Sequence, residues 1–273
     1  MTDSAELLDD LIGGFLRESP SRYSIQAHGL EEKRSVLRSL MNIRYPVPAS
    51  PELIGLQDRY LIARRDERGI VDEKDIDTID VAFGSHSAHS DRIALWQGDI
   101  TTLRCGAIVN AANSRMLGCF RPGHLCIDNC IHTYAGIQLR LECDRRMREV
   151  GKGVKDFEWP TSVPMLTDSY NLPCDKVVHV VGPISSGTLN ERLEDQLADC
   201  YSNTLDMCRD NGIRTVAFCC ISTGVFGFPN RRAAEIAVDT VRRWLDVNGG
   251  YVDKVIFNVF LDRDRGIYEE LLG

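Results

Sequence analysis

Residues 215–230 read TVAFCCISTGVFGFPN, an apolar run over 215–221 that leads into a glycine-containing loop. Residues 231–247 continue with the spacing of an amphipathic helix. Apolar runs of this length are typical of strands that are buried on both faces. The same pattern recurs after residue 81, with apolar runs at 93–96, 107–109, 177–181 and 255–260 and helical spacing near 127–148 and 189–209. Strands that alternate with helices predict an α/β sandwich, in which ligands bind beyond the carboxyl ends of the strands.

The first 81 residues have a different pattern, which predicts a helical extension. Leucine, isoleucine and phenylalanine recur at one-, three- and four-residue steps over 7–16, and 36–41 repeat this spacing. Ser50 followed by Pro51 predicts the start of another helix, and 66–80 are expected to be a loop. We therefore expect a helical extension over 1–81 and one α/β domain over 82–273.

Composition excludes several classes of protein. No apolar run approaches the ~18 residues of a membrane-spanning helix, and the net charge of −8 argues against a protein that binds duplex DNA through its phosphates. The first residues, MTDSAELLDD, lack the basic and apolar segments of a signal peptide. The ten cysteines are therefore expected to be reduced thiols in a cytoplasmic protein, where they pack in the core, bind metal or take part in catalysis.

Two strand ends carry polar side chains that suit a nucleotide ligand. Asp99 follows Gly98 after the first apolar run, and its carboxylate can accept hydrogen bonds from the amine of a base. Capping of the next turn is the simpler explanation for Asp99. Asn113 follows the second run, where its amide can offer both a donor and an acceptor to a sugar hydroxyl. A strand that ends in asparagines is also common without any ligand.

The loop after Gly118 contains Cys119, His124 and Cys126. Two thiolates and an imidazole are a suitable set of ligands for Zn²⁺, and three protein ligands would leave one position open, as in catalytic zinc sites. Cys130 or His132 could supply a fourth ligand and close the site. Two alternatives remain, because buried cysteines are often plain core residues and a cysteine beside a histidine can act as a nucleophile.

The loop from Ser222 to Phe226 (Ser222, Thr223, Gly224, Val225 and Phe226) lies between a strand and a helix. Backbone N–H groups in such a loop can bind a phosphate, and the helix behind it favours anions. The loop has no lysine and is therefore not a Walker A motif. Phe226 could stack on a base or ribose, or it could seal the core.

Together these segments resemble the macrodomain family of ADP-ribose-binding proteins and hydrolases. The resemblance covers roughly 82–273 and rests on GDIT at 98–101, IVNAANS at 108–114, VVHVVGP at 177–183 and ISTGVFGFP at 221–229. It implies a three-layer α/β/α sandwich with a mixed sheet. The stretch CFRPGHLCIDNCIHTYAG, at 119–136, replaces the usual glycine-rich loop of hydrolytic macrodomains and resembles the zinc-containing subgroup of protein-ADP-ribose hydrolases. That subgroup also has an N-terminal helical extension.

The resemblance assigns a role to each segment. Asp99 and the backbone of Ile100 are expected to bind adenine, the Ser222–Phe226 loop to bind the diphosphate with Phe226 near the distal ribose, and Asn113 to bind a hydroxyl of that ribose. Cys119, His124 and Cys126 are expected to hold one Zn²⁺ beside it. Asp128, which opens the next helix, is the expected catalytic partner of Asn113, whereas His132 is expected to be structural.

The function that follows is the zinc-dependent removal of mono-ADP-ribose from protein side chains. In some microbes the zinc-containing subgroup is encoded beside a sirtuin-type ADP-ribosyltransferase and lipoyl-carrier proteins, so a modified lipoyl carrier is one expected substrate. Neither a nucleic acid nor a membrane is an expected partner. The alternatives are a module that binds ADP-ribose without cleaving it and a deacetylase of O-acetyl-ADP-ribose. The extension is expected to be a packed structural appendage, or else to recruit the modified protein.

Overall fold

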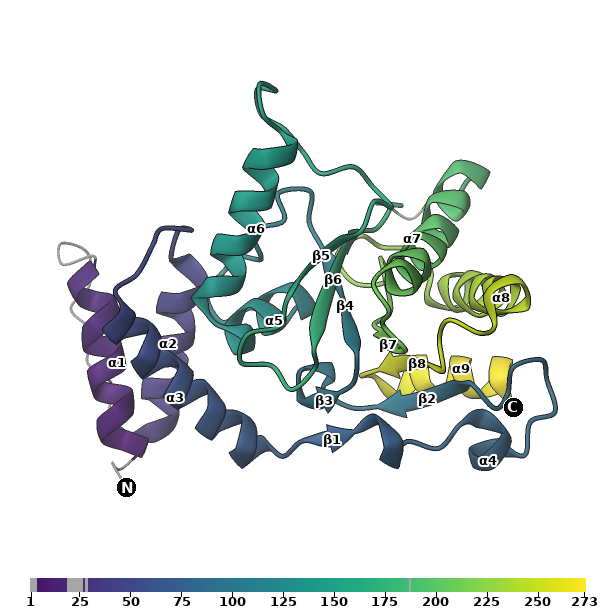
Figure 1. The fold of residues 1–273 in the computed structure, drawn as a ribbon, viewed down its shortest axis with the longest axis horizontal. Helices are drawn as coiled ribbons and strands as arrows, with labels where there is room; N and C mark the ends of the chain where they lie inside the picture. Colours follow the sequence, from purple (N-terminus) through teal and green to yellow (C-terminus); the bar gives the residue numbers. More distant parts are fainter. Residues whose placement is uncertain (1–3, 19–26, 28, 187) are drawn as a thin grey trace.

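Three helices lead into a mixed β-sheet that has helices on both of its sides (Figure 1). The computed structural model describes residues 4–18, 27, 29–186 and 188–273. The N-terminal helices are α1 (Ser4–Glu18), α2 (Leu30–Ile43) and α3 (Pro51–Arg68). The predicted start of α3 is confirmed, because the Ser50 hydroxyl accepts a hydrogen bond of 3.2 Å from the backbone N–H of Leu53.

The N-terminal helices share a core of their own, which also includes a residue of the sheet unit. Leu8, Leu11, Leu37 and Leu61 are buried in this core together with Ile137, which begins a helix beside the sheet. Fully burying side chains of this size stabilises a fold by about 1.5–3 kcal/mol each. The three helices are therefore packed against the rest of the molecule.

The segment after α3 is more ordered than the loop predicted for 66–80. It contains β1 (Val71–Asp72), the 3-10 turn η1 (Glu73–Asp75) and α4 (Ile79–Phe83). Strand β1 pairs in parallel with β3 (Leu103–Arg104), and Ile76 and Ile79 are buried in the core of the sheet unit. This packing extends the sheet unit to residues before 82, and the division at residue 81 stays a prediction.

Six strands form the main sheet, in the order β2-β8-β7-β4-β6-β5. Their bounds are β2 (Ile93–Gln97), β4 (Ala107–Ala112), β5 (Met165–Asp168), β6 (Lys176–Val181), β7 (Thr215–Phe218) and β8 (Lys254–Val259). All neighbours pair in parallel except β5, which is antiparallel to β6. The predicted mixed sheet is confirmed. β5, which the sequence did not predict, is a short edge strand with an alternating burial pattern.

Helices cover both faces of this sheet. They are α5 (Ile127–Ala135), α6 (Ile137–Val150), α7 (Glu191–Asp210), α8 (Asn230–Asn248) and α9 (Asp262–Leu272). Figure 1 shows α5 and α6 on the side of the N-terminal helices and α7 and α8 on the other side. One helix was predicted over 127–148, but Gly136 divides it with a φ of 101°, and a Cβ there would lie 2.6 Å from Gln57 Nε2. Among the described helices, none is long and apolar enough to span a membrane.

The sheet order decides where the candidate site lies. Strands β2, β8, β7 and β4 are neighbours and run in parallel, so their carboxyl ends meet at one edge. At about 4.8 Å per strand, these four ends span about 14 Å. Each predicted ligand-binding segment follows one of them.

Candidate functional site

The predicted site residues occur in a fixed spatial order along the carboxyl edge of the sheet. Asp99 and Ile100 follow β2, the Ser222–Phe226 loop follows β7, and Asn113 follows β4. β8 lies between β2 and β7. Along this edge, the segment expected to bind adenine is therefore followed by the loop expected to bind the diphosphate and then by the residue expected to bind the distal ribose.

Asp99 caps the turn that follows β2, as the simpler explanation predicted. Its Oδ1 accepts hydrogen bonds from the backbone N–H of Thr101 at 2.9 Å and from the Thr101 hydroxyl at 2.6 Å. Within the described residues the backbone N–H of Ile100 donates to no acceptor. The Ile100 N–H could donate to the ring nitrogen on one edge of adenine, and the partly exposed Asp99 carboxylate could accept from the amine on the same edge. Asp99 can therefore cap the turn and bind a base at the same time.

Arg68, the last residue of α3, holds the other oxygen of Asp99. Its guanidinium forms an ion pair with Asp99 Oδ2, donates to Thr101 Oγ1 at 2.7 Å and lies 3.8 Å from the centre of the Tyr134 ring. The sequence did not predict this residue, because its position at the end of a distant helix carried no local signal. The N-terminal helices thus reach the end of the sheet edge at which Asp99 lies.

Phe260 is a second residue that the sequence analysis missed. It follows β8, and 72% of it is exposed although it ends an apolar run. Its backbone is held beside the Asp99 turn, because Gln97 Nε2 donates to Phe260 O at 3.3 Å and Asn258 Nδ2 donates to Gly98 O at 3.0 Å. An exposed aromatic ring at this position can stack on a base.

The Ser222–Phe226 loop presents free backbone donors. Ser222 has a φ of 65°, and Phe228 N donates to Ser222 O at 3.0 Å, which closes the loop. In the part of the chain that the structure describes, the N–H groups of Gly224, Val225 and Phe226 donate to no acceptor. Consecutive free N–H groups bind anions without a basic side chain. This arrangement fits a phosphate.

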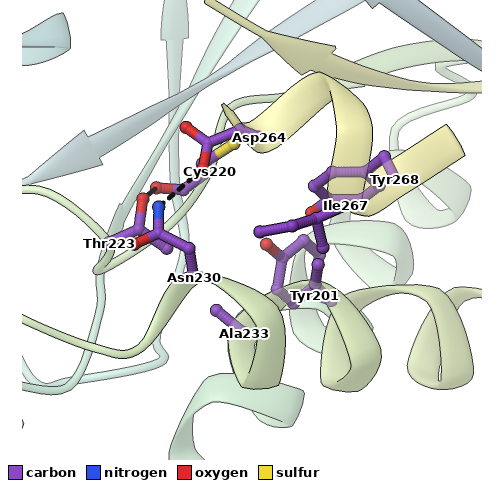
Figure 2. Close-up of a pocket in the computed structure, with 9 residues that line it drawn as sticks. Tyr201, Cys220, Thr223, Asn230, Ala233, Asp264, Ile267 and Tyr268 are labelled. Carbon is purple, nitrogen blue, oxygen red and sulfur yellow. Dashed lines mark hydrogen bonds between the residues drawn. The ribbon is translucent and has the colours of Figure 1, made fainter. Parts of the chain in front are cut away.

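Two contacts fix the position of this loop. A Cβ at Gly182, just after β6, would lie 2.1 Å from Ser222 Oγ, so the close approach requires glycine. Figure 2 shows the root of the loop, where Thr223 Oγ1 donates to Cys220 O at 3.0 Å and Asn230 Nδ2 donates to Asp264 Oδ1 at 2.6 Å. The hollow that these residues line lies between the loop, α8 and α9.

At the β4 end, Asn113 and Asp128 contact each other. Asn113 Nδ2 donates to Asp128 Oδ2 at 3.0 Å and to Gly118 O at 3.2 Å, while Asn113 Oδ1 accepts from the backbone N–H of Arg115 at 3.0 Å. Both amide hydrogens are therefore used. Asn113 can therefore offer a ribose hydroxyl only the second lone pair of Oδ1. The sequence predicted that it could offer both a donor and an acceptor, and in the structure only the acceptor is left.

Asp128 is almost fully buried in a network of hydrogen bonds. Asn110 Nδ2 donates to Asp128 Oδ1 at 2.8 Å and lies 3.0 Å from His179 Nδ1. Because Nδ1 accepts from this amide, the proton of the His179 ring is assigned to Nε2, which faces Thr167 Oγ1. Burial raises the pKa of Asp128 to about 6, against the two asparagine hydrogen bonds and Arg140, which lower it. Burial also lowers the pKa of His179 to about 3, so this histidine is neutral.

Cys119, His124 and Cys126 form the cluster that the sequence predicted. Their ligand atoms all lie within 4.8 Å of one another, and Cys119 Sγ is 3.5 Å from His124 Nδ1. All three are partly exposed, in contrast to the second group of metal-ligand types in the described residues, His132, Cys143 and His179, which is buried in the core. Two thiols and an imidazole that converge in a partly exposed loop fit a zinc ion.

Neighbouring groups limit which residues can join this cluster and how Cys126 is held. Cys126 is the N-cap of α5, where its Sγ accepts from the backbone N–H of Asn129 at 3.4 Å. Burial raises the pKa of Cys126 to about 12, which favours the protonated thiol. Cys130 and His132 are not part of the cluster, because Cys130 Sγ accepts from Arg38 and the His132 ring packs against Gly118 and His179.

Comparison with known proteins agrees with this geometry. Residues 109–237 match the Macro domain family. A protein-ADP-ribose hydrolase from Treponema medium is 44% identical over 264 residues, which cover 96% of this chain and 97% of that protein. A probable bifunctional ADP-ribose hydrolase/ADP-ribosyltransferase from Fusarium oxysporum f. sp. cubense is 38% identical over 295 residues, covering 100% of this chain and 47% of that protein.

Solved structures show the same fold. The Trypanosoma brucei macrodomain in complex with ADP-ribose superposes with a TM-score of 0.65 at 30% identity, and the match covers 86% of this chain and 95% of that one. The sheet order, the strand-end loops and these similarities agree in one conclusion: the chain belongs to the Macro domain family.

Proposed function

We propose that this protein is a zinc-dependent hydrolase that removes mono-ADP-ribose from modified protein side chains. The observation that carries the proposal is that Cys119, His124 and Cys126 converge at the same strand end as Asn113 and Asp128. The names of the relatives from Treponema and Fusarium support hydrolysis. A module that only binds ADP-ribose would need no set of metal ligands there.

ADP-ribose fits along the edge in one direction. Asp99 and the Ile100 N–H bind adenine, and the exposed Phe260 ring stacks on it. The free N–H groups of the Ser222–Phe226 loop bind the diphosphate, with Phe226 near the distal ribose. Asn113 Oδ1 accepts from a hydroxyl of that ribose, which brings the anomeric carbon to Asp128 and the cysteine loop.

The reaction breaks the bond between the anomeric carbon and the protein side chain and forms a new bond from that carbon to a water oxygen. Asp128 orients the attacking water and accepts its proton, and this proton then passes to the departing side chain, which leaves as the unmodified acceptor. Asn113 keeps the ribose in place. Cys119, His124 and Cys126 are the residues that would hold a zinc ion, which would supply Lewis-acid chemistry when bound.

The partner and the location follow from the same proposal. The Fusarium relative, whose name includes an ADP-ribosyltransferase, supports a substrate that a partner transferase modifies. A lipoyl carrier modified by a sirtuin-type transferase is the protein substrate that we propose, on the resemblance to the zinc-containing subgroup alone. All ten cysteines carry free thiols, which supports a cytoplasmic location.

A release assay tests the function. Acceptor proteins modified on acidic, serine and arginine side chains, and on a lipoyl carrier, are incubated with the protein, and free ADP-ribose is measured. We expect release from at least one acceptor. Tight ADP-ribose binding by calorimetry with no release from any linkage would instead indicate a binding module, and release of acetate from O-acetyl-ADP-ribose alone would indicate the deacetylase.

A further inference from the structure

The loop that carries the three metal-ligand residues has no regular secondary structure of its own. It runs from Gly118 to Cys126, between β4 and α5, and Leu125 within it is 79% exposed. A loop of this kind has many alternative conformations, and bringing its three ligands together costs conformational entropy. Contacts from elsewhere in the molecule therefore decide how well the ligands are arranged before a metal binds.

Arg38, on α2, holds the second half of this loop. Its Nη2 donates to His124 O at 2.9 Å, to Asn129 Oδ1 at 2.9 Å and to Cys130 Sγ at 3.3 Å. His124 is itself a metal-ligand residue, so its backbone position is set by an arginine that is 86 residues away in the chain. The guanidinium is the side chain best suited to bridging several acceptors at fixed angles.

Asn42, one turn further along α2, holds the middle of the loop. Its Oδ1 accepts from the backbone N–H of Gly123 at 3.0 Å, and its Nδ2 donates to Thr133 Oγ1 at 2.9 Å. Asn129 completes the framework, since its Nδ2 donates to Cys119 O at 3.2 Å and to Arg121 O at 3.1 Å. Arg38 and Asn129 are bonded to each other, so these contacts form one connected network.

Arg140 links the residue before the loop to the C-terminal end of α2 through hydrogen bonds. Arg140 donates from Nε to Leu117 O at 2.7 Å and from Nη1 to Met41 O at 3.1 Å and Asn42 O at 2.9 Å. Its guanidinium also lies 4.3 Å from the centre of the Phe120 ring, which in turn packs against Tyr45. Helix α2 thus touches the loop, directly or through Arg140, near both of its ends and in the middle.

We propose that helix α2 holds the metal-binding loop in place and that Arg38 and Asn42 are the positioning residues for Cys119, His124 and Cys126. The inference rests on the proposed function, because it presumes that the cluster binds zinc. It replaces the expectation of a packed structural appendage with a specific role. Residues that orient metal ligands typically change metal affinity by 10–100-fold when they are replaced.

The test compares Arg38→Ala with a matched control on the same helix. Arg34 bonds to Glu31 and Glu67, both within the N-terminal helices, so Arg34→Ala removes an α2 arginine without touching the loop. Zinc affinity is measured on the full chain by competition with a chromophoric chelator. We expect Arg38→Ala to weaken zinc binding about 10–100-fold and Arg34→Ala to leave it unchanged.

Two further measurements separate positioning from general loss of stability. Hydrogen exchange of the metal-free protein should show faster exchange at Gly123 and His124 in Arg38→Ala, with the β4 and β6 amides still protected. The visible absorption of bound Co²⁺, which reports ligand geometry, should shift in Arg38→Ala only. The Asn42→Ala variant should follow Arg38→Ala in both measurements.

Each outcome has one meaning. Equal zinc affinity and equal loop exchange in wild type and Arg38→Ala would overturn the positioning role and leave the zinc site standing. Equal losses in Arg38→Ala and Arg34→Ala would also overturn it, because the effect would then come from the helices as a whole. A wild-type protein that binds no zinc would overturn the zinc role itself.

Discussion

Asn113 is restricted by its neighbours to one kind of contact with a ligand. Both of its amide hydrogens are used by Asp128 and Gly118, so a ribose hydroxyl must donate to Oδ1. Asp128 thereby fixes the orientation of Asn113, and in the proposed complex Asp128 lies close to the anomeric carbon. In that proposal one carboxylate both positions Asn113 and orients the attacking water.

Replacing Asp128 with asparagine separates charge from shape. The variant keeps the volume but offers the Asn110 and Asn113 amides one oxygen fewer, which we expect to destabilise the fold by about 1–3 kcal/mol. ADP-ribose release should be slower by at least ~100-fold, because proton transfer contributes about that much. Calorimetry should show that free ADP-ribose binds only moderately more weakly, because Asn113 is held less firmly, so that the loss of affinity is much smaller than the loss of release rate. Release at the wild-type rate would exclude Asp128 from the reaction.

Phe260 offers a test of the adenine end alone. If its exposed ring stacks on the base, Phe260→Ala should weaken ADP-ribose binding by about 1–3 kcal/mol, the usual contribution of one stacked base. Phe260→Tyr should bind normally, and ribose 5-phosphate, which lacks the base, should bind both variants equally. An unchanged Kd for ADP-ribose in Phe260→Ala would remove the ring from the site.

At the scale of elements, the position of the Ser222–Phe226 loop depends on Gly182, which follows a different strand. A Cβ at residue 182 would lie 2.1 Å from Ser222 Oγ and 2.7 Å from Ile221 Cγ2, so Gly182→Ala must displace the loop. We expect a loss of ADP-ribose affinity of at least tenfold, which corresponds to about 1.4 kcal/mol. Gly55→Ala, where nothing lies within 4 Å of the new Cβ, is the matched control and should bind normally.

Elements with a strong local pattern could be predicted from the sequence, and those that depend on distant partners could not. The five predicted strands are present, because continuous valine and isoleucine runs fit only a buried sheet. The strand predicted over 215–221 is shorter in the structure, because β7 ends at Phe218 and the chain then forms the loop. β1, β3 and β5 were missed because two or four residues of mixed polarity carry little signal.

The candidate site was predictable to the same extent. The sequence indicated Asp99, Asn113, the cysteine cluster and the Ser222–Phe226 loop, because each lies in a recognisable segment after a strand. Arg38, Asn42 and Arg68 could not be found, since they act from helices that only the tertiary fold brings to the sheet edge. An arginine on a helix is an ordinary surface residue until its partners are known.

At the scale of the whole molecule, the buried histidine makes stability depend on pH. The pKa of His179 is about 3 in the folded protein and about 6.5 in an unfolded chain, so between these values only the unfolded chain binds the proton. The free energy of unfolding should therefore fall with falling pH below about 6.5, by about 2 kcal/mol between pH 6.5 and 5 from this residue.

Chemical denaturation across this pH range measures the effect. His179→Gln keeps a polar side chain that does not titrate, so the free energy of unfolding of the variant should depend less steeply on pH than that of the wild type. Comparing the two removes the contribution of other titrating groups, such as Asp128, whose raised pKa acts in the opposite direction. Parallel curves for the two proteins would show that His179 titrates normally in the folded state.

The most direct test of the central claim is turnover as a function of zinc content. One preparation is stripped with a chelator, dialysed and reloaded with increasing Zn²⁺, and ADP-ribose release from a modified protein is measured at each step. We predict negligible release without zinc, recovery that is complete at one ion per chain, and no recovery in Cys126→Ser. Full turnover in a verified zinc-free preparation would contradict the account.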